Sequence, residues 1–80
     1  MSEVAQREMT FGERAVGLSF NPSGDTQVGD LKVKAAAFID ACHAMRGDGA
    51  DKEIARMASI AITEAQTAQM WAVKAATWKD

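Results

Sequence analysis

The feature that most constrains the fold of this chain is the spacing of apolar residues, many of them alanine, over residues 51–78. Two sets of residues recur there at alternating steps of three and four, the repeat of one face of an α-helix. The segment therefore predicts one long helix, about 40 Å if unbroken. The first set is rich in alanine and contains Ile54, Ala58, Ala61, Ala65, Ala68, Ala72 and Ala75. The second mixes large apolar and polar residues, namely Met57, Ile60, Glu64, Thr67, Trp71, Lys74 and Trp78.

A second helix is predicted over residues 28–46. Its apolar stripe follows the same alternation and consists of Val28, Leu31, Ala35, Phe38, Cys42 and Met45, widened by Ile39. We expect Asp25 or Thr26 to cap this helix and Asp51 to cap the long one. Gly47 suits the left-handed position that ends a helix. The short link makes an antiparallel hairpin, which cannot bury both sets of the long helix, so one set remains available to another chain.

Residues 1–14 are expected to form a short helix capped by Ser2, and residues 15–27 a connection with a turn at residues 21–24. Phe20 precedes that turn, where chains usually place polar residues. The expected fold is thus all-α, a single domain over residues 1–80 with a short N-terminal helix and a helical hairpin. A chain of this size buries roughly 60–65% of its surface, so we expect a compact homo-oligomer.

Composition argues against several classes of function. A net charge of −2 with both signs interspersed is unlike a duplex nucleic-acid binder, and no apolar run has the roughly 18 residues of a membrane span. With one cysteine and no signal-peptide pattern, the expected location is the cytoplasm. Cys42 and His43 are helix neighbours about 100° apart, a poor geometry for a nucleophile and its base. They also offer too few ligands for zinc, so we expect no enzyme, metal or cofactor.

A few residues have the chemistry of nucleotide binding. Phe20 offers a ring for base stacking and Asn21 an amide for a base edge. Lys32 and Arg56 lie near helix N-termini, which favour anions, and Arg adds a fork for phosphate. Simpler interpretations remain open: Phe20 as a plug over the hairpin, the two cations as solvated surface charges, and Trp71 as part of an oligomer core.

Four segments share a pattern with a known family: Gly-Leu-Ser-Phe-Asn-Pro-Ser-Gly at 17–24, Phe-Ile-Asp at 38–40, Arg-x-x-Ser-x-Ala-x-Thr-Glu at 56–64 and Ala-x-Met-Trp-Ala at 68–72. On these segments the chain resembles the phage anti-CBASS cyclic-nucleotide sponges, whose hairpin domain is shared with Thoeris anti-defence sponges. The resemblance implies a compact hexamer, a trimer of dimers, in the cytoplasm of the infected bacterium. It implies sequestration of cyclic oligonucleotide messengers without cleavage, and so inhibition of CBASS-type signalling.

The resemblance also implies roles for particular residues. Cyclic dinucleotides would lie between two protomers, with Phe20 stacked on a purine, Asn21 beside it and Lys32 on a phosphate. Some members hold cyclic trinucleotides in separate pockets, to which Lys34 and Arg56 would correspond, although Lys32 and Lys34 could exchange roles. The expected interface residues are Ala61, Ala65, Ala68, Trp71 and Ala72. The alternatives are a Thoeris-type sponge for cyclic ADP-ribose isomers and a helical adaptor that docks a host protein through the Trp71 face.

Overall fold

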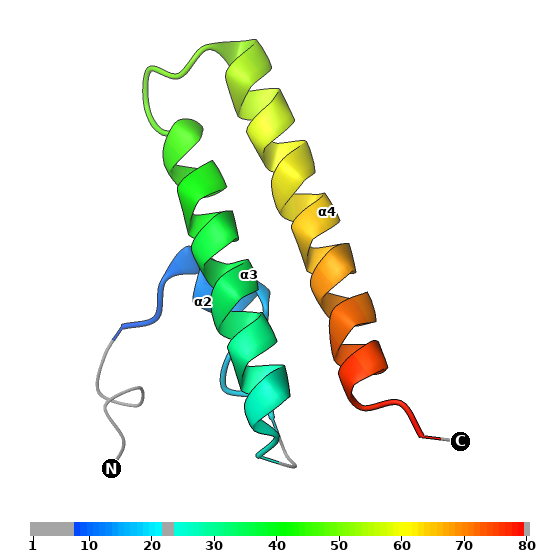
Figure 1. Ribbon diagram of the computed structural model, residues 1–80. Helices are drawn as coiled ribbons and strands as arrows, with labels where there is room; N and C mark the ends of the chain where they lie inside the picture. The colour runs from blue at the N-terminus through cyan, green and yellow to red at the C-terminus, as the bar shows by residue number, and fades with distance from the viewer. Residues whose placement is uncertain (1–7, 22–23, 80) are drawn as a thin grey trace.

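The computed structural model describes residues 8–21 and 24–79, which form three helices and no strand (Figure 1). The helices are α2 (Phe11–Ala15), α3 (Thr26–Met45) and α4 (Lys52–Ala76). α3 and α4 form an antiparallel hairpin, and the short α2 packs against α3. This part of the chain therefore confirms the all-α expectation. None of its helices is long and apolar enough to cross a membrane.

Aspartate caps begin both long helices. The Asp25 carboxylate accepts hydrogen bonds from the backbone N–H groups of Gln27 (2.8 Å) and Val28 (3.1 Å). Asp51 accepts in the same way from Glu53 (2.8 Å) and Ile54 (3.3 Å). Each bond satisfies an amide that has no partner within its helix, so both expected caps are confirmed and α3 begins two residues earlier than expected.

The link between the long helices differs in detail from the sequence prediction. α3 ends at Met45 with Arg46 as its C-cap. The left-handed glycine of the link is Gly49, with φ of 81°, and not Gly47. Glycine adopts this conformation without the steric cost that a Cβ atom imposes, so the reversal occurs two residues later than predicted.

Within the described residues, the helix before the connecting segment begins only at Phe11. Residues 1–7, and with them the expected cap at Ser2, lie outside the described residues, while residues 8–10 precede the helix. Thr10 is the cap: its hydroxyl accepts from the Glu13 N–H (3.1 Å), and the Glu13 carboxylate accepts from the Thr10 N–H (2.9 Å). This reciprocal pair is a capping box, and it places the start of α2 at Phe11.

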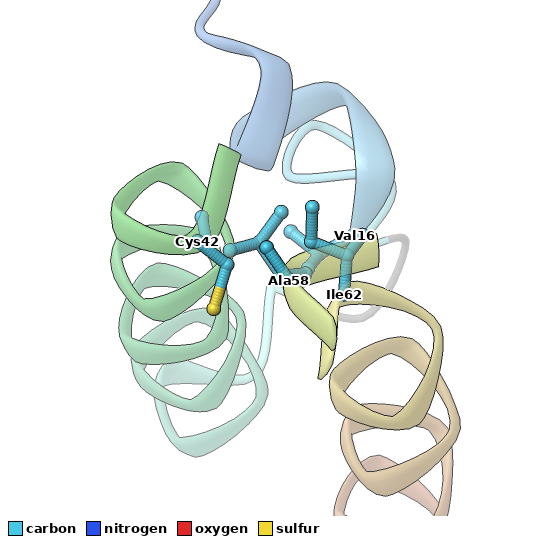
Figure 2. Packing of buried hydrophobic residues seen from close by; sticks show 6 residues of the cluster. Val16, Cys42, Ala58 and Ile62 are labelled. Atoms are coloured by element: carbon cyan, nitrogen blue, oxygen red, sulfur yellow. The ribbon is translucent and has the colours of Figure 1, made fainter. Parts of the chain in front are cut away.

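The core lies where α2 crosses the hairpin. Figure 2 shows Val16, which follows α2, pointing toward Cys42, Ala58 and Ile62 of the two long helices. Ile39 is fully buried, and Ala36 completes the cluster. The Gln66 side-chain amide also donates to the backbone oxygen of Ala15 (3.3 Å), so α2 is tied to α4 as well as to α3.

The buried face of α3 is rotated from the one expected. The residues of α3 that are buried are Val28, Lys32, Ala36, Ile39 and Cys42. Phe38 and Met45 of the expected stripe are more than half exposed. The reason is that α2 covers the side of α3 that carries Ala36 and Asp40. Leu31, Ala35 and Phe38 of that stripe instead border an open groove on the other side of the hairpin. The other residues that line this groove are Lys34, Ala65, Ala68, Gln69 and Ala72.

Gly12 allows α2 to lie directly on the backbone of α3. Its N–H donates to the Asp40 carboxylate at 2.7 Å. A Cβ atom built on Gly12 would stand 2.1 Å from the Ala36 carbonyl oxygen, far inside van der Waals contact. Only glycine fits here without displacing α2.

We therefore expect Gly12→Ala to lower the free energy of unfolding by about 1–3 kcal/mol, the usual cost of overpacking a close contact. The matched control is Gly47→Ala, whose Cβ would stand at an ordinary 3.6 Å from the Ala44 carbonyl oxygen. Urea unfolding of the two variants measures the difference. Equal midpoints for both would show that α2 does not depend on this contact.

Candidate ligand-binding site

The candidate site is formed by the described residues 17–21 and 24–25 of the connection between α2 and α3, together with Lys32. The Phe20 N–H donates to the Gly17 carbonyl (2.9 Å), and the Gly24 N–H donates to the Asn21 carbonyl (3.0 Å). Gly17 and Gly24 have φ of 63° and 66°, which only glycine adopts readily. The segment thus reverses direction twice, and the described ends of the Asn21–Gly24 turn close as expected.

The side chain of Lys32 in α3 is hydrogen-bonded to this segment. Its residue is only 5% exposed, and its ammonium donates to the carbonyl oxygens of Gly17 (3.0 Å) and Phe20. An ammonium has three N–H donors, so these bonds use two of them. The sequence interpretation of Lys32 as a solvated charge is therefore wrong, because this side chain is a buried tie between α3 and the connecting segment.

The Phe20 side chain is exposed to solvent and lies next to the Lys32 ammonium. The residue is 73% exposed, and the Lys32 ammonium lies 5.4 Å from the centroid of its ring. The ring therefore does not act as a plug within this chain. Its distance to the ammonium is in the range of a cation–π contact, so a cation and an exposed aromatic face occur side by side.

Asn21 organises the turn with its side chain. Its amide nitrogen donates to the Asp25 carbonyl (2.8 Å), and the Asp25 N–H donates to its amide oxygen (3.3 Å). Because Asp25 also caps α3, these bonds set the turn against the start of that helix. One amide N–H and the second oxygen lone pair are left for other partners such as a base edge.

Lys34 and Arg56 differ from Lys32 in their surroundings. Lys34 forms an exposed ion pair with Asp30 at 2.9 Å and borders the groove between α3 and α4. Arg56 forms an exposed ion pair with Glu53, whose pKa is lowered by this bond, while that of Arg56 is raised. It lies near the start of α4, and that end of the hairpin is opposite the start of α3 (Figure 1). One chain thus brings Phe20, Asn21 and Lys32 together, without Arg56.

The surroundings of the Lys32 ammonium favour the binding of an anion beside it. Among residues 8–21 and 24–79, no carboxylate forms a salt bridge with its ammonium. Buried cations are ordinarily paired with an anion. The described contacts of the Lys32 ammonium are instead the carbonyl oxygens of Gly17 and Phe20 and the Phe20 ring. The geometry suits a ligand that combines a planar ring, for stacking on Phe20, with a nearby negative charge.

The other end of the hairpin contains a cluster that sequence reasoning missed. The Arg46 guanidinium lies 5.2 Å from the Phe11 ring centroid and donates to the Ser59 hydroxyl (2.9 Å). Phe11 stacks on His43 with centroids 4.2 Å apart. Three separate segments meet here, so no local spacing reveals the cluster. His43 is engaged in this stack and Cys42 is buried and free, and the described residues contain no group of three or more metal-ligating side chains.

Comparison with known proteins gives one finding. The family model described as Acb2/Tad1, hairpin domain, matches residues 13–77. The match covers most of the chain, including the connecting segment and both long helices. No curated protein and no solved structure matches.

Lys32 and Lys34 provide a matched pair of variants. We expect Lys32→Met to lower the free energy of unfolding by about 1–3 kcal/mol, because it leaves two carbonyls without their donor. Lys34→Met removes only an exposed i,i+4 ion pair and should change it by no more than about 0.5 kcal/mol. Denaturant unfolding measures both, and hydrogen exchange at the Phe20 amide should accelerate only in Lys32→Met. Equal behaviour of the two variants would contradict the tie.

Proposed function

Because the chain belongs to the Acb2/Tad1 hairpin-domain family, we propose that it is a phage anti-defence sponge that sequesters cyclic oligonucleotide messengers in the infected host cell. Members of this family sequester their ligands and are not known as enzymes. The observation that carries the proposal is the exposed Phe20 ring beside the ammonium of the buried Lys32, which has no carboxylate partner among the described residues. Together they match the two parts of a nucleotide, its base and its phosphate.

The preferred ligands in this proposal are cyclic dinucleotides of CBASS-type signalling. A base would stack on Phe20, and a phosphate would approach the third donor of Lys32, with Asn21 beside the base edge. A cyclic dinucleotide has two bases and two phosphates related by an approximate two-fold axis. A two-fold pair of protomers presents each of these side chains twice, so ligand and site share their symmetry.

The proposed assembly is a homo-oligomer, a hexamer built as a trimer of dimers. Its support is the bare side of the hairpin, away from α2, where the groove between α3 and α4 is apolar. Ala65, Ala68 and Ala72 line this groove, with Ala61 in the same stripe, and small side chains allow a helix of a second copy to approach closely. Trp71, which is 65% exposed in the single chain, is the remaining interface residue of this proposal.

Arg56 would serve a second pocket for cyclic trinucleotides. Arg56 lies near the start of α4, and its side chain is exposed in the ion pair with Glu53. Three copies around a three-fold axis would present three guanidinium forks to three phosphates. Lys34, whose side chain is also exposed, is the second candidate for this pocket.

Sequestration requires slow release and no reaction chemistry. A cyclic ADP-ribose isomer, the ligand of the Thoeris alternative, also combines a purine with phosphates. The same pair of side chains suits it, so a ligand panel must distinguish the two. A suitable panel contains cyclic di-AMP, cyclic di-GMP, cyclic GMP-AMP, a cyclic tri-adenylate and cyclic ADP-ribose isomers.

We expect a cyclic dinucleotide from this panel to raise the melting temperature by several degrees. Phe20→Leu should then weaken binding at least about fivefold, because stacking on an aromatic ring is worth about 1–3 kcal/mol per base. Phe20→Tyr keeps the ring and is the matched control, expected to bind within about threefold of the natural protein. Calorimetric titration gives the constants. A flat thermal response to every ligand would exclude the sponge.

Arg56→Ala should weaken cyclic tri-adenylate binding at least about tenfold and leave cyclic dinucleotide binding unchanged. Because the Arg56 side chain is exposed, its removal should leave the fold intact. Lys52→Ala, which removes a cation from the same end of α4, is the control. Equal loss of both ligands in Arg56→Ala would argue for a single shared pocket.

A further inference from the structure

The side of α4 that points away from α3 is a second unpartnered surface. Its residues, which we call the outer α4 face, are Met57, Ile60, Glu64, Thr67, Trp71, Lys74 and Trp78, and all are exposed. Helical spacing places this face opposite Ala58 and Ile62, the buried residues of α4. Trp71 and Trp78 are 65% and 66% exposed, a large apolar area for water to contact.

The order of residues on this face has an internal symmetry. Counted outward from Thr67, the steps are three, seven and ten toward Met57 and four, seven and eleven toward Trp78. A second α4 laid antiparallel, with a two-fold axis at Thr67, would therefore put Met57 level with Trp78 and Glu64 level with Trp71. Ile60 would lie level with Lys74 and Ala75.

From this symmetry we propose that α4 pairs with α4 of a second copy through the outer α4 face, antiparallel and centred on Thr67. The shape of the face supports this register. Trp71, Lys74, Ala75 and Trp78 surround a shallow hollow, and their spacing is that of the four residues that form a hole in knobs-into-holes packing. Ile60 of the second copy is the apolar side chain at that level, so it fills the hollow.

The charges select the antiparallel direction. The Lys74 ammonium lies 5.2 Å from the Trp71 ring centroid, so it reaches back to the level of Trp71. In the proposed register, Glu64 of the second copy comes to that same level, and the two-fold axis makes the ion pair twice. A parallel pairing in register would instead set Glu64 against Glu64 and Lys74 against Lys74, which is unfavourable.

This pairing rests on the assembly in the proposed function and adds a second contact to it. The outer α4 face is separate from the groove between α3 and α4, which has its own apolar lining. One self-complementary face alone makes a dimer. Two different faces on one chain allow an assembly larger than a dimer, as a trimer of dimers requires.

Charge reversal tests the pairing. Glu64→Lys and Lys74→Glu each place like charges together, and each should raise the dissociation constant of the α4 contact more than about tenfold. The double variant restores two opposite-charge pairs and should recover the mass of the natural protein in light scattering. Asp30→Lys, a reversal on the exposed side of α3, is the control. Dilution of the natural protein should also shift Trp emission to the red, because both indoles return to water.

A double variant that stays dissociated while both single variants dissociate, or single variants that keep the full mass, would overturn the register. Ile60→Asp is a second test, because a carboxylate placed in the hollow should dissociate the contact independently of the ion pairs between Glu64 and Lys74. The same samples are titrated with the cyclic dinucleotides. Recovery of mass by the double variant without any ligand binding would leave the pairing standing and reject the sponge. Ligand binding together with unaltered masses of the single variants would reject the pairing and leave the sponge standing.

Discussion

The contact of Gly12 with the backbone of α3 determines how the rest of the chain is arranged. It anchors a helix of five residues, which alone could not be stable in water, through one hydrogen bond to Asp40 and a close backbone approach. Once α2 is fixed there, Val16 enters the space between the long helices and closes the core. After α2, the chain runs back along α3 to reach the N-terminus of that helix. Residues 17–20 therefore pass over the side chain of Lys32.

The buried ammonium of Lys32 links fold and site for that reason. It donates to two carbonyls of the connecting segment, whose Phe20 ring is exposed and does not pack against the core. A neutral residue of equal length would leave those carbonyls without a donor, and a carboxylate nearby would cancel the charge. The same cation therefore stabilises the turn and keeps a local positive charge beside an exposed ring, which is the combination that a nucleotide phosphate and base require.

Local patterns predicted the helices well, and long-range packing decided what they could not. The three-four spacing and the caps Asp25 and Asp51 placed both long helices to within about two residues of the structure. The capping box of Thr10 and Glu13 was also readable and was overlooked. The rotation of α3 was not readable, because a buried Lys32 and an exposed Phe38 depend on where α2 lies. Phe20 and Lys32 were predicted as neighbours in function, but their actual geometry depends on carbonyl bonds that no spacing encodes.

The coverage of the hairpin by α2 also bears on how ligand binding and association are coupled. Because α2 covers one side only, the apolar groove between α3 and α4 and the large apolar side chains of the outer α4 face remain exposed in the single chain. A small domain gains stability by burying such faces against its own copies. If two copies contribute Phe20 and Lys32 to one site, a ligand binds the associated state in preference to the single chain and shifts the equilibrium toward it. Assembly and capture then stabilise each other, so release of the ligand is slowed by contacts far from the Phe20 ring.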